Sequence, residues 1–116
     1  MKMILSHLDV GGKARMVDVS DKPTTTREAI AFGEVKVRRE VLGLIKSGRI
    51  LKGDVLAAAR LAGIMAAKKA GELIPLCHPL SIDVVELVFR IERERIVIRA
   101  FVRSTGKTGV EMEALT

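Results

Sequence analysis

Apolar and polar side chains alternate along four stretches of the chain, a period of two that predicts half-buried β-strands. These stretches are residues 14–20, 27–37, 82–91 and 95–103. A charged trio, ERE, separates the last two stretches, and we expect them to pair as an antiparallel hairpin. Turn and loop residues at 21–26 separate the first two.

Two short stretches show the three- and four-residue spacing of a surface helix instead. Residues 38–47 have apolar side chains at this spacing, and Gly48 follows where a helix readily ends in the left-handed conformation. Residues 110–116 begin a similar pattern after a loop at 104–109. We therefore expect a short helix in each stretch.

The longest helical pattern follows Asp54, whose carboxylate suits the N-cap position. The run VLAAARLAGIMAAKKAG comes next, with Lys68 and Lys69 in the last turn and Gly71 expected to end the helix. Seven alanines and Gly63 leave this helix with little bulk. Small side chains let a helix lie close to a neighbour, so we expect it to be buried at a packed interface.

The chain has 116 residues, 48% of them hydrophobic, which is enough for one domain with a core and too few for two ordinary domains. We therefore expect a single domain over residues 1–116. No apolar run of membrane-spanning length and no leader peptide is apparent, and we expect a soluble, cytoplasmic protein with no membrane partner. A single cysteine forms neither an internal disulfide nor a multi-thiolate zinc site.

Twenty Lys and Arg residues against fourteen Asp and Glu residues give a net charge of +6, which favours an anionic partner. Nucleic acid, a membrane surface and a phosphorylated small molecule all remain open on charge alone. Proteins that bind single-stranded nucleic acid interleave basic residues with stacking aromatics, whereas this chain has three Phe and neither Trp nor Tyr. A basic module that binds duplex backbone stays an alternative.

The stretch LIPLCHPL places the only cysteine, Cys77, beside His78 and between Pro75 and Pro79. Neighbouring residues on an extended backbone point to opposite sides, so this pair does not form a nucleophile and its base. Two candidate ligands without a second pair give little support for zinc. A buried thiol and a hydrogen-bonded imidazole are the simplest interpretation, but prolines that stiffen the backbone beside a polar ring also favour a binding site.

Three further motifs carry weaker signals. Lys52, just before the N-cap, is either a solvated side chain or a cation beside a helix N-terminus that suits phosphate. Residues 106–108 read GKT, but the earlier glycine of a P-loop is missing, and a turn that exposes Lys107 is the simpler interpretation. On a helix, Glu111 and Glu113 would project about 200° apart, and capping explains both.

In their order along the chain these features resemble one family. The chain is similar to molybdenum-cofactor biosynthesis protein C, also called cyclic pyranopterin monophosphate synthase, along the runs HLDVGGKARMVDVSDKPTTTREAIAFGEV, KGDVLAAARLAGIMAAKKAGELIPLCHPL and STGKTGVEMEALT. The resemblance covers essentially the whole chain, and ordered matches of this length are far more specific than a short pattern.

The resemblance implies an α+β domain of the ferredoxin-like type, a sandwich in which an antiparallel sheet packs on helices. It also implies a homohexamer, a trimer of dimers, with each site shared between subunits. Family members take the cyclised triphosphate that a radical enzyme makes from GTP and convert it to cyclic pyranopterin monophosphate, releasing pyrophosphate. We therefore expect a lyase with a small-molecule triphosphate as its partner, and no nucleic acid, no membrane, no resident cofactor and no metal.

The resemblance also assigns roles to residues. Lys52 matches the family's essential lysine and would transfer a proton or neutralise charge as the cyclic phosphate forms. Glu113 belongs to a matching Met-Glu pair, and its carboxylate would accept hydrogen bonds from the guanine-derived ring. The residues expected to bind substrate are Leu76, Cys77, His78, Met112 and Glu113. Arg103, Lys107 and Glu111 are expected neighbours on weaker grounds.

Family members continue beyond the final helix into a segment with a catalytic Asp and, one turn later, a catalytic Lys. This sequence ends at Thr116, so none of its residues matches those two roles, and we expect an omitted tail or a naturally short chain. The alternatives are therefore an enzyme and a non-catalytic binding or assembly subunit that keeps the phosphate pocket. The activity of the 116-residue chain alone stays open.

Overall fold

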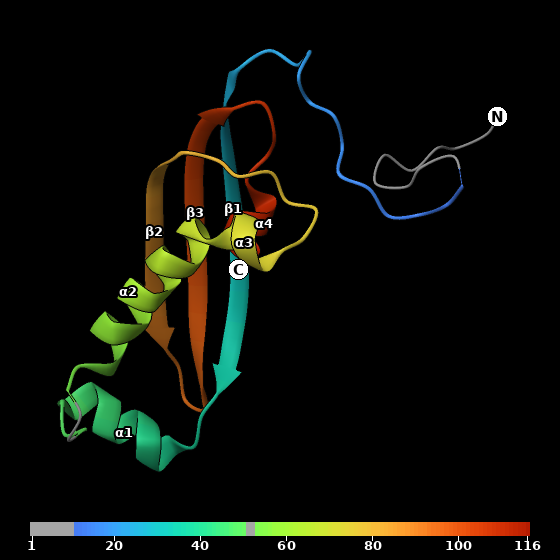
Figure 1. Cartoon of the computed structure of the whole chain (residues 1–116). Helices are drawn as coiled ribbons and strands as arrows, with labels where there is room; N and C mark the ends of the chain where they lie inside the picture. The colour runs from blue at the N-terminus through green and yellow to red at the C-terminus, as the bar shows by residue number, and fades with distance from the viewer. Residues whose placement is uncertain (1–10, 51–52) are drawn as a thin grey trace.

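The computed structural model describes residues 11–50 and 53–116, and it shows a three-stranded antiparallel sheet with helices packed on one face (Figure 1). Along the chain the elements are β1 (Thr25–Lys36), α1 (Arg39–Ser47), α2 (Val55–Lys68), α3 (Ala70–Leu73), β2 (Ile82–Ile91), β3 (Arg95–Gly106) and α4 (Glu111–Leu115). With the helices between β1 and β2 taken together, this order matches the first five elements of the ferredoxin-like β-α-β-β-α-β motif. The α+β prediction is confirmed.

The sheet has the strand order β1-β3-β2. β2 and β3 form the predicted hairpin, and β1 pairs antiparallel with the other side of β3. The register places Val102 of β3 between Ala29 of β1 and Val85 of β2. A bulge at Asp83 shifts the register by one residue, so that Ile82 and Val85 both face the helices.

The core lies where α4 packs on the sheet. Val102, Val110 and Ala114 are buried together there, surrounded by partly buried Ala29, Ala31, Leu80, Ile82 and Val85. Among the described residues, seven hydrophobic side chains in all are buried. Many large apolar side chains are correspondingly exposed, among them Phe32, which is 70% exposed.

Both predicted helix boundaries near residues 48 and 54 are confirmed. α1 ends at Gly48, whose φ of 70° is the left-handed conformation that glycine adopts without strain. α2 begins after Asp54, whose carboxylate accepts a hydrogen bond from the backbone N–H of Ala57 at 3.0 Å. This bond satisfies one of the free donors in the first turn of the helix.

The helix expected to run as far as Gly71 ends earlier. Lys69 leaves helical geometry with φ −105° and ψ 8°, and the short α3 begins at Ala70. Gly71 therefore lies inside α3 and is not a helix stop. A Cβ at Gly71 would lie 3.2 Å from the Cα of Pro79, so the glycine permits a close approach of the loop that follows.

The expectation that α2 is buried at a packed interface is wrong for most of the helix in this chain, because only Ala67 of α2 is buried and one face alone lies close to the sheet. A Cβ on Gly63 would overlap the Leu87 side chain of β2, and Arg60 Nε donates a hydrogen bond to the Leu87 carbonyl at 3.3 Å. The other face carries Leu61 and Met65, which are 64% and 56% exposed. The helix is thus packed on one side, and the described residues leave its other side uncovered.

The prediction of a strand over residues 14–20 is wrong. The structure has a single bridge at Ala14, then irregular backbone and a turn at 20–22 in which Lys22 N–H donates to the Val19 carbonyl at 3.0 Å. An alternating sequence becomes a strand only where another strand pairs with it, and this segment runs away from the sheet (Figure 1).

The first and last strand boundaries also differ from the prediction. β1 begins at Thr25, inside the stretch predicted as loop, and β3 continues to Gly106, three residues beyond the predicted end. The two extensions have one cause, because Thr25 and Gly106 are partners at the end of the same ladder. Within the described part of the chain, no helix has the length and hydropathy needed to cross a bilayer.

Candidate functional site

A pocket of about 660 Å³ opens where the segment before β1, the loop after α3 and the start of α4 meet. Its volume lies within the range of roughly 300–1,000 Å³ that is usual for small-molecule sites. The lining residues are Ala14, Val17, Val19, Lys22, Ile74, Pro75, Leu76, Cys77, His78, Thr108, Gly109, Glu111 and Met112. Four of the five predicted substrate-binding residues therefore lie around one cavity.

A tight turn shapes one wall of this pocket. The backbone N–H of Cys77 donates to the Ile74 carbonyl at 3.1 Å, which closes a turn with Pro75 at its second position. This turn position favours proline, because the proline ring fixes φ near the value that the turn requires. The stiffness predicted from the prolines thus takes the form of a turn that presents Cys77 and His78 to the pocket.

The Cys77 thiol points toward α4. Its Sγ donates a hydrogen bond to Glu113 Oε1 at 3.2 Å. Burial raises the pKa of the Cys77 thiol to about 11, and the hydrogen bond to the Glu113 carboxylate is the next largest cause. The thiol therefore keeps its proton at neutral pH and is not an activated nucleophile.

The His78 ring points to the segment before β1. Its Nε2 lies 2.6 Å from the carbonyl oxygen of Val17. A carbonyl can only accept, so Nε2 carries a proton, and Nδ1 is the acceptor nitrogen of the neutral ring. As predicted, Cys77 and His78 have different partners, and the imidazole holds the segment before β1 against the pocket wall.

Glu113 does not line the pocket. It is 4% exposed, its Oε1 accepts from Cys77, and its Oε2 is buried without a hydrogen-bond partner among the described residues. α4 turns Glu113 inward and leaves Glu111 on the pocket wall, because side chains two apart on a helix point in different directions. Direct contact between Glu113 and a ring system stays a prediction.

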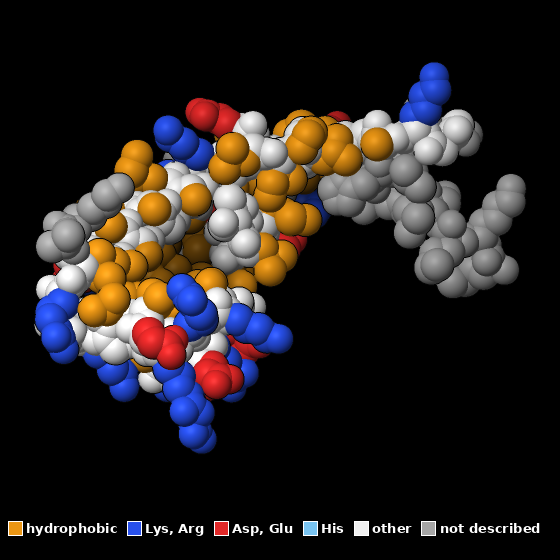
Figure 2. Space-filling model, turned by 90° about the horizontal axis from the view of Figure 1, so that it is seen from below, with side chains coloured by type: hydrophobic (Ala, Val, Ile, Leu, Met, Phe, Trp, Pro, Cys, Tyr) orange, Lys and Arg blue, Asp and Glu red, His pale blue; other side chains and the backbone are white. Residues whose placement is uncertain are grey.

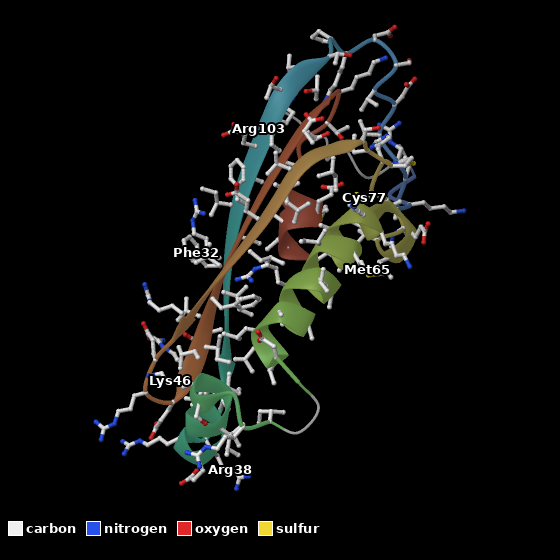
Figure 3. The ribbon with its side chains drawn as sticks, turned by 90° about the vertical axis from the view of Figure 1, so that its left-hand side faces the viewer. Phe32, Arg38, Lys46, Met65, Cys77 and Arg103 are labelled. Carbon is white, nitrogen blue, oxygen red and sulfur yellow. The ribbon has the colours of Figure 1, made fainter. Side chains whose placement is uncertain are left out.

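The basic residues near the pocket differ in part from those expected. Lys107 lies at the edge of the site, where its Nζ donates to the Ser20 carbonyl at 3.2 Å. Arg103 lies on the opposite face of the sheet and pairs with Glu28 at 2.9 Å (Figure 3). The prediction of Arg103 as a neighbour of the site is therefore wrong, because alternate residues of β3 face away from the helices.

Sequence reasoning missed the contribution of the segment before β1. Val17, Val19 and Lys22 all line the pocket, although the pattern there predicted a strand and a turn. Periodicity identifies residues that pack in regular elements, and an irregular segment gives no such signal. The sequence signal that could have pointed to Lys22 as a pocket residue is its position as a basic side chain in the predicted loop at 21–26.

The catalytic lysine expected at position 52 lies outside the described residues. Within residues 11–50 and 53–116, no group of three or more His, Cys, Asp or Glu side chains is placed to hold a metal ion.

Comparison with known proteins gives consistent matches over most of the chain. Residues 16–116 match the MoaC family. A cyclic pyranopterin monophosphate synthase of Pelotomaculum thermopropionicum is 59% identical over 114 residues, which cover 97% of this chain and 67% of that protein. A protein of the same name from Novosphingobium aromaticivorans is 56% identical, over 97% of this chain and 71% of its own length. The chain belongs to the MoaC family.

Proposed function

We propose that this chain is a cyclic pyranopterin monophosphate synthase of molybdenum-cofactor biosynthesis. It would act as a lyase that converts the cyclised, GTP-derived triphosphate to cyclic pyranopterin monophosphate with release of pyrophosphate. The observation that carries the proposal is the gathering of Leu76, Cys77, His78 and Met112 around one pocket, in a chain 59% identical to a protein of that name.

The chemistry of the pocket wall suits such a substrate. Leu76, Met112 and Val17 offer apolar surface to a planar ring. Lys22 lines the same cavity and supplies positive charge for a phosphate. Lys107 lies at the edge of the cavity, and its ammonium group has N–H donors in addition to the one that binds the Ser20 carbonyl. Nδ1 of a neutral His78 ring can accept a hydrogen bond from a ring N–H.

Cys77 takes a supporting role in this proposal. Its proton is directed to Glu113, and Cys77 also lines the pocket. Glu113 would then influence the substrate through the thiol that it orients. No thiolate step is required.

The chemical step rests on Lys52, which we propose as the catalytic lysine on the resemblance alone. The resemblance likewise supports a homohexamer, a trimer of dimers with sites between subunits, and a cytoplasmic enzyme. The exposed apolar surface of the described residues is consistent with assembly.

The test is pyrophosphate release when the purified chain is mixed with the cyclised triphosphate. Lys52→Ala should abolish release, whereas Lys46→Ala should not change it, because Lys46 is an exposed lysine at the end of α1 and does not line the pocket (Figure 3). Release by both variants at the wild-type rate would contradict the role of Lys52. Substrate binding without release would favour the non-catalytic subunit instead.

A further inference from the structure

Residues 17–22 form one wall of the pocket without belonging to a helix or strand. Figure 2 shows the segment before β1 extending sideways from the body made by the sheet and helices, as in Figure 1. A segment outside the sheet has no ladder of backbone hydrogen bonds to fix its place, so single hydrogen bonds to the rest of the chain matter more. Two such bonds reach this segment from other loops around the pocket.

The two bonds both end on backbone carbonyls of the segment. His78, in the loop after α3, places Nε2 2.6 Å from the carbonyl oxygen of Val17. Lys107, in the loop after β3, donates from Nζ to the carbonyl oxygen of Ser20 at 3.2 Å. Because the direction of a carbonyl is set by the backbone dihedral angles, these bonds require one particular backbone conformation between the two acceptors.

Asp18 lies between the two acceptors and bonds within the segment. Its Oδ1 accepts a hydrogen bond from the backbone N–H of Ser20 at 3.0 Å, which makes a turn in which a side-chain oxygen replaces a backbone carbonyl. The N–H of Lys22 donates to the Val19 carbonyl at 3.0 Å and closes a second turn directly after the first. The Ser20 N–H holds the pKa of the Asp18 carboxyl below its ordinary value of 3.8, so the acceptor is ionised at neutral pH.

Asp18 acts from outside the pocket. Val17 and Val19 are half-buried and line the cavity, whereas Asp18 is exposed and is not among the lining residues. A ligand in the pocket therefore does not touch the carboxylate. The route inward runs through Val17, whose carbonyl meets the imidazole of His78. A carbonyl at Nε2 requires the ring proton there and leaves Nδ1 to accept, so the direction of the Val17 carbonyl decides what the ring offers to a ligand.

We propose that Asp18 is a positioning residue of this pocket. By accepting from the Ser20 N–H, it directs the Val17 carbonyl at His78 and holds the imidazole with its proton on Nε2 and its lone pair on Nδ1. The purpose of that lone pair, which is to accept a hydrogen bond from a ring N–H of the substrate, rests on the function proposed above. The placement of the ring itself depends on the protein alone.

Two substitutions separate the hydrogen bond of Asp18 from its charge. Asp18→Asn keeps an oxygen acceptor and removes the negative charge, whereas Asp18→Ala removes both. The probe is the His78 ring, observed by nuclear magnetic resonance in chains labelled with ¹⁵N-histidine, at a pH about two units above the ordinary histidine pKa of roughly 6.5. The chain has two histidines, and His7→Gln assigns the signals.

In the wild type we expect the proton on Nε2 of His78, seen as a signal that exchanges slowly with water. Asp18→Ala should speed this exchange roughly fivefold or more, the effect of losing an ordinary hydrogen bond. Asp18→Asn should keep the wild-type rate. Asp21→Ala is the matched control, because Asp21 is an exposed aspartate at the neighbouring turn, and it should leave the rate unchanged.

A wild-type ring with its proton on Nδ1, an Asp18→Ala signal identical to that of the wild type, or an Asp18→Asn variant that matches Asp18→Ala would overturn the proposal. Calorimetric titration of the cyclised triphosphate gives a second readout, in which Asp18→Ala should bind roughly fivefold more weakly and Asp18→Asn should bind as the wild type does. The resonance experiment needs no ligand. Absence of triphosphate binding to every variant and to the wild type would contradict the proposed function, while the ring signal still decides the role of Asp18.

Discussion

At the scale of single residues, the pKa of the Cys77 thiol measures its contact with Glu113, which lies behind the pocket wall. Its thiol donates to Glu113, and burial together with that carboxylate raises the thiol pKa to about 11. Glu113→Gln keeps the shape of the side chain and removes its negative charge. We expect the pKa of Cys77 to fall toward its ordinary value of 9.0, because the thiolate is then no longer repelled. The measurement is the rate of thiol alkylation as a function of pH.

The matched control for this prediction is Glu111→Gln. The charge of Glu111 also raises the pKa of Cys77, but it is the smallest of the causes, so its removal should produce a smaller downward shift. A Cys77 pKa that Glu113→Gln leaves unchanged would show that the Glu113 carboxylate does not act on the thiol in solution.

The same thiol makes stability depend on pH. The pKa is raised from 9.0 in the unfolded chain to about 11 in the folded one, so the folded state holds the proton more tightly. Its contribution to the free energy of unfolding is present below pH 9 and is lost as the pH rises toward 11. We expect urea denaturation curves to show this loss in the wild type, and Cys77→Ala to lack that component, although other groups titrate in both proteins. If the free energy of unfolding of the two proteins depended on pH in the same way, Cys77 would not be the source of this loss.

At the scale of elements, α2 depends on its N-cap. Asp54→Ala removes the hydrogen bond to the N–H of Ala57 and should lower the free energy of unfolding by about 1 kcal/mol. Asp21→Ala, at an exposed turn, is the control and should change stability by less than about 0.5 kcal/mol. Thermal or chemical denaturation measures both. Equal effects of the two substitutions would mean that the cap is not formed.

Two helical glycines should respond oppositely to alanine. Gly43 in α1 has open space where a Cβ would lie, so Gly43→Ala should stabilise the protein by roughly 0.5–1 kcal/mol through backbone entropy. A Cβ at Gly63 would overlap Leu87, so Gly63→Ala should show no such gain, and the larger Gly63→Val should destabilise by roughly 1–3 kcal/mol. A gain at Gly63 equal to that at Gly43 would contradict the close packing of α2 on β2.

Regular elements were predictable from the sequence because their signals are local. The Gly48 stop, the Asp54 cap and the hairpin between β2 and β3 each follow from a few neighbouring residues. The strand predicted at 14–20 does not form, because strand pairing is not a local property. Alternation shows that a segment could pair with the edge strand of a sheet, but it does not show that such an edge strand lies beside the segment. The break at Lys69 is of the same kind, because the approach of Pro79 to Gly71 lies outside the helix pattern.

At the scale of the whole molecule, some pocket residues were predictable from local motifs and others depend on contacts between distant segments. The sequence motifs identify Leu76, Cys77, His78 and Met112, and the structure gathers them. The motifs do not reveal that Val17 forms the opposite wall through its bond to His78, because no spacing rule links residues 61 apart. Glu113 lies behind Cys77 for a related reason, since only the packing of α4 on the sheet decides which of its faces is inward.

Calorimetric titration of the cyclised, GTP-derived triphosphate into the full chain would test whether this pocket binds that compound. We expect saturable binding that Lys22→Ala weakens roughly tenfold, the equivalent of one charge-assisted hydrogen bond of about 1.5 kcal/mol. Met112→Ala should weaken binding as well, while Lys46→Ala should leave the affinity unchanged. Absence of binding, or an affinity that none of the pocket substitutions changes, would show that the triphosphate does not bind in this pocket.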